Sequence, residues 1–319
     1  MDNDPAYDQE CRFNCEQPWV AFACTIGLGI RLMPTKAVVP SYEPMLAAYH
    51  RAFAPELRAM VGTLPIAEGE IVLDMACGDG VYSPWLAELV GSAGWVVAVD
   101  VMPEYLDLAR KETARSPLAR IIEFSAASIE LLPFKNDTFD LCWCAQSLYS
   151  LPDPVDSLRQ MLCVTKPGGV VAVMEEDTLH NVILPWPIEV ELSVRVAELR
   201  ALTDTSDKPR KFYVGRQLRR LFRRAGLDGI QTRTFASDRV APLGSNERTF
   251  LTEYLKSLSE LIATYLDGQI RSEFDRLVDP HSSEFMLDDA DLTTTCINYV
   301  VWGRKPSCVT KEPVRRDPA

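Results

Sequence analysis

The chain has 319 residues, 47% of them hydrophobic and 24% charged, which predicts a folded protein with a sizeable core. Its net charge of −12 argues against a nucleic-acid substrate, because basic patches normally supply most of that affinity. Nine cysteines are scattered along the chain, so we expect reduced cytoplasmic thiols. Cys11 and Cys15 are not accompanied by a second pair of metal-ligand residues, so we expect no metal site.

The first 40 residues differ from the rest, since they mix polar and apolar residues with four prolines. This pattern predicts an N-terminal arm over residues 1–40. Its apolar run, 19–30, is shorter than the ~20 residues that span a membrane. The acidic residues before that run have the wrong sign for a secretory signal. We therefore expect a cytoplasmic protein without membrane insertion.

From residue 41 to 64 apolar side chains recur at helical spacing, with a break near Pro55. A short apolar strand, 71–74, follows and ends in Asp74. Small residues and two glycines then lead into an amphipathic helix over 82–90. Strand, glycine turn and helix together predict a nucleotide-type crevice beyond the carboxyl ends of parallel strands.

The acid at the end of this strand narrows the choice of ligand. Asp74 would repel a polyphosphate and suits a ligand that carries a positive charge. A dinucleotide fingerprint needs a third glycine where Ser83 stands, and a P-loop needs Gly-Lys-Ser/Thr where the chain has Gly80-Val81-Tyr82. Both phosphate-binding motifs are therefore absent.

Strands and helices continue to alternate after this turn. The strand 95–100 also ends in an acid, Asp100, which can accept hydrogen bonds from both hydroxyls of a ribose. The patterns that follow predict helices at 103–114 and 153–165, and strands at 120–124, 139–145 and 170–174.

The stretch from Leu73 to Gly80 resembles the first motif of the class I S-adenosylmethionine-dependent methyltransferases, Leu-Asp-hydrophobic-Gly-Cys-Gly-x-Gly. Ala76 replaces the first glycine, which we expect to be tolerated where the backbone needs no positive φ. Residues 127–134 and 137–140 resemble the family's Gly-Asp-Ala-Glu-x-Leu-Pro-Phe segment, with Ser128 at the usual adenine-binding Asp. Leu-Pro-Asp-Pro at 151–154 and Lys-Pro-Gly-Gly at 166–169 follow in the family's order.

The resemblance implies a Rossmann-like α/β fold: a seven-stranded, mostly parallel sheet with helices on both faces and an antiparallel last strand. We expect the sixth strand at 229–235 and the seventh at 296–303. The methyltransferase domain would span 41–305, with a helical insertion over 239–294 that acts as a lid. Its helix, 250–265, would combine with a second helix, 188–202. We expect the tail, 306–319, to be disordered.

The cofactor implied by the resemblance is S-adenosylmethionine. Residues of the first helix, Tyr42, Tyr49 and His50, either face this cofactor or simply pack. Asp74, Gly78 and Gly80 would hold its methionine part, Asp100 its ribose, and Ser128 with Ile129 its adenine; Ala76, Val101, Met102 and Ala145 complete the expected cofactor-binding set.

Methyl transfer needs a base only when the nucleophile carries a proton, so no fixed triad is expected. His180, after the fifth strand, is the candidate base, and Glu175 and Glu176 compete with it. Tyr149 would be a substrate wall or hydrogen-bond donor unless it only packs.

We expect a small organic acceptor, no nucleic acid, and allow for a homodimer. Two alternatives stay open. One is a protein of this fold that binds the cofactor without catalysis, as a sensor or subunit. The other is an NAD-dependent oxidoreductase, which the missing third glycine disfavours.

Overall fold

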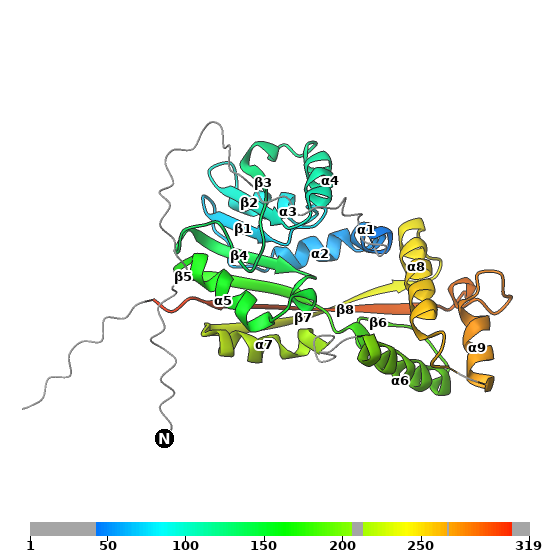
Figure 1. Ribbon diagram of the computed structural model, residues 1–319. Coiled ribbons are helices and arrows are strands. Elements are labelled where there is room, and N and C mark those ends of the chain that lie inside the picture. Colours follow the sequence, from blue (N-terminus) through cyan, green and yellow to red (C-terminus); the bar gives the residue numbers. More distant parts are fainter. Residues whose placement is uncertain (1–42, 206–212, 267, 308–319) are drawn as a thin grey trace, which may run out of the picture. The chain divides into compact units, whose positions relative to one another are not determined.

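The computed structural model describes residues 43–205, 213–266 and 268–307, which build a mixed α/β structure around one sheet (Figure 1). The strands run in the order β3-β2-β1-β4-β5-β8-β6, and β7 also pairs with β8. Their bounds are β1 Ile71–Met75, β2 Trp95–Asp100, β3 Ile122–Ala126, β4 Phe139–Ala145, β5 Thr165–Glu175, β6 Val182–Ile183, β7 Asp228–Val240 and β8 Thr293–Arg304.

The sheet confirms the predicted topology. Strands β1 to β5 are parallel to one another. Strand β8 lies between β5 and β7 and is antiparallel to both. The two-residue strand β6, which pairs with β8, is an addition that the sequence did not predict because it is too short to show a period.

The helices that the sequence predicted lie close to their expected positions, whereas α9 was not predicted, and the helix ends follow local chemistry. The helix expected over 41–64 divides at Phe53, because Pro55 suits a first helical turn and not a helix interior. Asp153 caps α5 by accepting hydrogen bonds from the backbone N–H groups of Val155 (2.8 Å) and Asp156 (3.2 Å). The bounds are α1 Glu43–Ala52, α2 Ala54–Val61, α3 Ser83–Val90, α4 Pro103–Thr113, α5 Pro154–Val164, α6 Ile188–Thr205, α7 Val214–Ala225, α8 Ser245–Ile262 and α9 Gly268–Val278.

Alternate residues of the central strands bury opposite faces of the sheet. Val72 and Trp143 pack into the core that α1, α2, α3 and α8 share. Leu73, Cys142 and Cys144 face α5 and α7. The two strand cysteines therefore serve as small buried apolar side chains.

Strand β8 extends beyond the end of β5 and positions the insertion. Its pairing with β5 ends at Tyr299, whereas its pairing with β7 continues to Thr293. Figure 1 shows β7 and β8 reaching past β5 toward α6, α8 and α9. Helix α8 packs on α1 and α6. The connection from β7 to β8 thereby returns to the carboxyl end of the parallel strands.

Three parts of the predicted organisation fall outside the described residues. These are the arm over 1–40, Tyr42, and most of the tail, 306–319. Within the described ranges, every helix is too short or too polar to cross a lipid bilayer.

Candidate cofactor and acceptor site

A cavity of about 760 Å³ opens at the carboxyl ends of the parallel strands. Its wall combines the ends of β1, β2, β4 and β5 with side chains of α1, α6 and α8. This size and position are typical of small-molecule sites in α/β folds. Most of the residues predicted to bind a cofactor meet here: Asp74, Ala76, Gly78, Asp100, Val101, Met102, Ser128, Ile129 and Ala145.

Asp74 ends β1 as a buried carboxylate. The Ser83 hydroxyl donates a hydrogen bond of 2.6 Å to its Oδ2. Burial raises the pKa of Asp74 to about 7, and the nearby acids Asp79 and Asp100 add to the shift. A cation in the cavity would offset this cost, so Asp74 favours a positively charged ligand group.

The glycine turn after β1 uses the left-handed region of backbone space at three positions, Ala76 (φ 55°), Gly78 (φ 52°) and Gly80 (φ 76°). The condition under which alanine was expected to be tolerated here, a backbone without a positive φ, is therefore not met. A β-carbon in this region costs roughly 1–2 kcal/mol. Backbone hydrogen bonds hold the turn in place: the N–H of Cys77 donates to the carbonyl of Val99 (3.0 Å), and the N–H of Gly80 donates to the carbonyl of Cys77 (2.9 Å).

The two glycines of the turn have different roles. No heavy atom lies within 4 Å of where a Gly78 β-carbon would stand, and Gly78 lines the cavity, so its bare backbone leaves room for a ligand. Gly80 is not part of the cavity wall. A β-carbon there would lie 2.7 Å from Cβ of Ala109, so this glycine lets the turn pack against α4.

Asp100 connects β2 to the turn through both of its carboxylate oxygens. The backbone N–H of Gly78 donates to Oδ2 at 3.0 Å, and that of Met102 donates to Oδ1 at 2.9 Å. Burial raises the pKa of Asp100, although these hydrogen bonds oppose the shift. The carboxylate is thus fixed at the cavity wall, with lone pairs left for two ligand hydroxyls.

Beyond β2 and β3 the cavity wall becomes more open and apolar. Val101 is 69% exposed, and Ile129 is partly buried. The Ser128 hydroxyl accepts a hydrogen bond of 3.2 Å from the backbone N–H of Glu130. Flat apolar surface beside one hydroxyl suits an aromatic base that carries an amino group.

A second polar cluster surrounds the end of β4. Gln146 has a positive φ of 50°, and its Oε1 accepts hydrogen bonds from Tyr82 (2.8 Å) and His50 Nε2 (3.0 Å). His50 Nδ1 lies 3.5 Å from Oδ2 of Asp79. Burial raises the pKa of Asp79, but the contacts with His50 outweigh it and hold this pKa below its ordinary value. The α1 helix therefore faces the cavity through His50 as well as packing on the core.

The structure separates the two candidate catalytic residues. Tyr149 lines the cavity, whereas His180 is not part of its wall. The His180 side chain is exposed and lies near Tyr213, with ring centroids 6.3 Å apart. His50 is the histidine that the described cavity wall contains.

Several lining residues were missed by sequence reasoning as site residues, among them Asn181, Glu198 and Ser257. Glu198 is buried on α6, and Nη1 of Arg195 lies 3.2 Å from its Oε2. Burial raises the pKa of Glu198 to about 7. A charged residue on a helix normally indicates a solvated face, so nothing in the sequence indicates this burial. Among the described residues, no cluster of His, Cys, Asp or Glu is arranged to hold a metal ion.

Comparison with known proteins agrees with this geometry. Residues 66–226, just over half of the chain, match the family model of a methyltransferase domain. The chain belongs to this family and has the fold of the class I S-adenosylmethionine-dependent methyltransferases.

Two curated relatives illustrate the similarity. Ubiquinone/menaquinone biosynthesis C-methyltransferase UbiE of Marinomonas sp. (strain MWYL1) is 31% identical over 166 residues, which cover 47% of this chain and 65% of the relative. Methyltransferase GfsG of Streptomyces halstedii is 29% identical over 184 residues, 57% of this chain and 60% of the relative. The chain thus spans less than two thirds of their length.

Similarity to a solved structure supports the fold but not the function. The crystal structure of a proposed methyltransferase from Bacillus halodurans C-125 aligns with a TM-score of 0.50 at 16% identity, over 79% of this chain and all of that one.

Proposed function

We propose that this protein is an S-adenosylmethionine-dependent methyltransferase that acts on a small organic acceptor by direct displacement. The observation that carries the proposal is the pair of buried acids, Asp74 and Asp100, at the ends of adjacent strands in one cavity. One carboxylate suits an ammonium group and the other suits two ribose hydroxyls. The methyltransferase names of the relatives support the same reaction class.

The residues present fit the cofactor. Asp74 would hold the ammonium group, the open space at Gly78 would admit the methionine chain, and Asp100 would hold the ribose. Ser128 and Ile129 would flank the adenine. When bound, the cofactor supplies an electrophilic methyl group on a sulfonium. We call this part of the wall, residues 74–78, 100–102 and 127–130, the cofactor half of the cavity.

The rest of the wall would hold the acceptor. It comprises His50 and its neighbours on α1, Gln146 and Tyr149 after β4, Glu176 and Asn181 after β5, and side chains of α6 and α8. We call it the acceptor half. These residues align the acceptor and exclude water, which is most of what a displacement at a methyl group requires.

The lid expected at 239–294 takes part as a fixed wall in this proposal. Leu258 of α8 lines the cavity, while Phe250 and Leu251 of the same helix belong to the main core. A helix with so much buried apolar surface would be costly to lift. It therefore would select the acceptor by shape.

His50 takes the place of His180 as the proposed proton acceptor, for an acceptor whose nucleophile carries a proton. Its ring is held between Gln146 and Asp79, at the edge of the acceptor half. Tyr149 remains proposed as a wall or hydrogen-bond donor. The cytoplasmic location and the homodimer stay predictions of the sequence.

The test is calorimetry with S-adenosylmethionine and its demethylated product, S-adenosylhomocysteine. Both should bind the wild-type protein, and Asp100→Ala should weaken binding about a hundredfold, because hydrogen bonds to a charged group are lost. Glu123→Gln, an exposed change on β3 away from the cavity, is the matched control. No heat with either ligand would overturn the proposal. Turnover with any acceptor of a metabolite panel would remove the non-catalytic alternative.

A further inference from the structure

The cavity wall is strongly acidic. Apart from His50, the described residues that line it include no basic side chain, neither Lys nor Arg. Such a wall disfavours an acceptor that carries a carboxylate or a phosphate. The six acids that line it are Asp74, Asp79, Asp100, Glu130, Glu176 and Glu198.

Most of these acids already have a counterpart. Asp74 and Asp100 belong to the cofactor half, and Glu130 is exposed at its outer edge. Asp79 lies 3.5 Å from His50 Nδ1. Glu198 pairs with Arg195. This leaves Glu176, whose carboxylate contacts an amide and not a cation.

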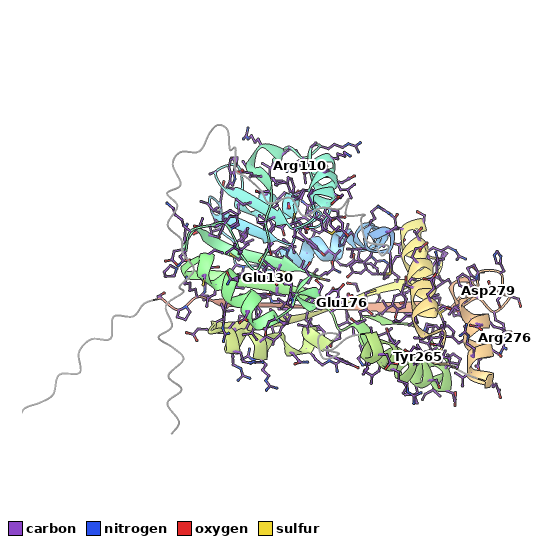
Figure 2. The ribbon with its side chains drawn as sticks, in the orientation of Figure 1. Arg110, Glu130, Glu176, Tyr265, Arg276 and Asp279 are labelled. Carbon is purple, nitrogen blue, oxygen red and sulfur yellow. The ribbon has the colours of Figure 1, made fainter. Side chains whose placement is uncertain are left out.

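Glu176 follows the last residue of β5, and Figure 2 shows it at the end of the sheet that faces α6 and α8. Its Oε1 accepts a hydrogen bond of 2.9 Å from Nδ2 of Asn181. Burial raises the pKa of Glu176, and the neighbouring Asp177 adds to the shift. The carboxylate thus bears a desolvation cost that one amide N–H offsets only in part.

Asn181 adds a second unsatisfied acceptor beside this carboxylate. Because its Nδ2 donates to Glu176, the amide cannot be turned round without placing two oxygens against each other. Its Oδ1 is buried and has no hydrogen-bond partner among the described residues. Buried polar atoms in native proteins are normally paired, so this oxygen calls for a donor from a ligand.

We propose that the acceptor carries a basic nitrogen, which the Glu176 carboxylate and the Asn181 amide oxygen hold together at the end of β5. An ammonium group offers several N–H donors and no acceptor, which matches two adjacent oxygens and neutralises the charge of one of them. A hydroxyl supplies a single donor and leaves the carboxylate uncompensated. This inference rests on the proposed function, since the acceptor half has meaning only beside a bound cofactor.

The test uses probes that the cofactor half anchors. Three aza-analogues of S-adenosylmethionine carry an aminopropyl, a hydroxypropyl or a carboxyethyl arm in place of the transferred methyl group, so that the arm projects toward the acceptor. Calorimetry against the full chain compares them with S-adenosylhomocysteine. We expect the amine arm to bind at least about tenfold more tightly than the hydroxyl arm, and the carboxylate arm to bind worst. Aminoethyl and aminobutyl arms complete the series in length.

Two variants test whether Glu176 and Asn181 cause the tighter binding of the amine arm. Glu176→Gln should remove the advantage of the amine arm and leave S-adenosylhomocysteine affinity unchanged. Asn181→Asp, which adds a carboxylate at the same place, should increase the advantage. Glu189→Gln, an exposed change on α6 outside the cavity wall, is the control.

The two proposals fail in different ways. If S-adenosylhomocysteine binds but no amine arm exceeds its hydroxyl counterpart, or if Glu176→Gln keeps the full advantage, the basic-nitrogen proposal is wrong. If neither S-adenosylhomocysteine nor any of the analogues binds, the proposed function itself fails.

Discussion

The two halves of the cavity are built in different ways. The cofactor half comes from one stretch of the chain, residues 74–130, in which the ligand-facing groups lie at or just after the ends of β1, β2 and β3. The acceptor half gathers side chains from α1, β4, β5, α6 and α8, which are spread from Met45 to Leu261. Local chain geometry therefore places the first set, whereas only tertiary packing places the second. This difference explains why one half is easy to predict and why the other is free to specify a substrate.

The largest expected effect concerns the base of the cofactor half. Gly80→Ala should destabilise the fold by about 3 kcal/mol, because the new methyl group would lie 2.7 Å from Cβ of Ala109 at a φ of 76°. Thermal unfolding measures the loss. Gly69→Ala is the control, since Gly69 also has a positive φ but nothing lies within 4 Å of where its β-carbon would stand. Equal losses in the two variants would show that the contact with α4 does not matter.

In the acceptor half, His50→Gln should lower turnover about a hundredfold for an acceptor that must lose a proton. The affinity for S-adenosylhomocysteine should change little, because the residue faces Gln146 and Asp79 and not the strand-end acids of the cofactor half. Steady-state kinetics and calorimetry give the two values. His180→Gln should leave both unchanged, and a larger effect there would restore His180 as the base.

A bulkier side chain in the acceptor half should also lower turnover of the acceptor without changing cofactor affinity. Leu261 of α8 lines the cavity and is only partly buried, so Leu261→Trp adds bulk without opening the core. We expect acceptor kcat/KM to fall about thirtyfold at unchanged cofactor affinity, a loss of about 2 kcal/mol. Leu199→Trp, on the exposed side of α6, is the matched substitution. Loss of cofactor binding in Leu261→Trp would show that Leu261 belongs to the cofactor half of the cavity.

The pH dependence of cofactor binding should report Asp74. Burial raises its pKa to about 7, so the carboxylate takes up a proton as the pH falls through that value and no longer attracts an ammonium group. Affinity for S-adenosylhomocysteine should fall about tenfold between pH 8 and pH 6. Without ligand, the stability of the protein should change with pH in the opposite direction. Asp74 keeps its proton up to about pH 7 in the folded state, whereas the unfolded chain loses it near pH 4. Asp74 therefore lowers the free energy of unfolding as the pH rises from 4 toward 7.

Two variants separate Asp74 from its neighbours. Asp74→Asn should bind the ligand weakly at every pH and flatten the profile. Glu198→Gln removes the other lining acid whose pKa burial raises to about 7, and it should retain the slope. A slope that disappears with Glu198 would assign the titration to the acceptor half.

The smallest expected effect is an increase in the stability of the folded protein. Ala76→Gly removes the strain of a β-carbon at φ 55° and should stabilise the protein by about 0.5–1 kcal/mol, after the greater freedom of glycine in the unfolded chain is counted. Denaturant unfolding measures it, and cofactor affinity should be unchanged. A loss of stability would mean that the methyl group of Ala76 contributes packing that outweighs the strain.

The alternation of strands and helices and the cofactor half could be predicted from the sequence because both depend on local signals, whereas the arrangement of the sheet was implied by the family resemblance. Asp74 and Asp100 end apolar runs, and parallel strands bring their carboxyl ends to one edge. The position of Ala76 in the turn was also predictable but its positive φ was not, since the residue type argues against that conformation. The sequence pattern assigns Gly80 to the cofactor, whereas its contact with Ala109 depends on how α4 packs.

Only part of the acceptor half was predicted, namely Tyr149 and the two helices expected to form the lid, and the reason is different. The period of α8 indicated an apolar face that includes Tyr254 and Leu258, but not what that face covers. Asn181 lies near a two-residue strand with no pattern, and Glu198 is a buried charge whose partner, Arg195, is on the same helix. No local rule indicates that such a charge faces a cavity.

A crystal structure with bound S-adenosylhomocysteine tests the division of the cavity most directly. We expect the ribose hydroxyls on the Asp100 carboxylate, the ammonium group beside Asp74, and the sulfur directed toward an acceptor half in which Glu176 and Asn181 remain uncovered. A ligand that lies instead against Glu176, with Asp100 untouched, would contradict this division.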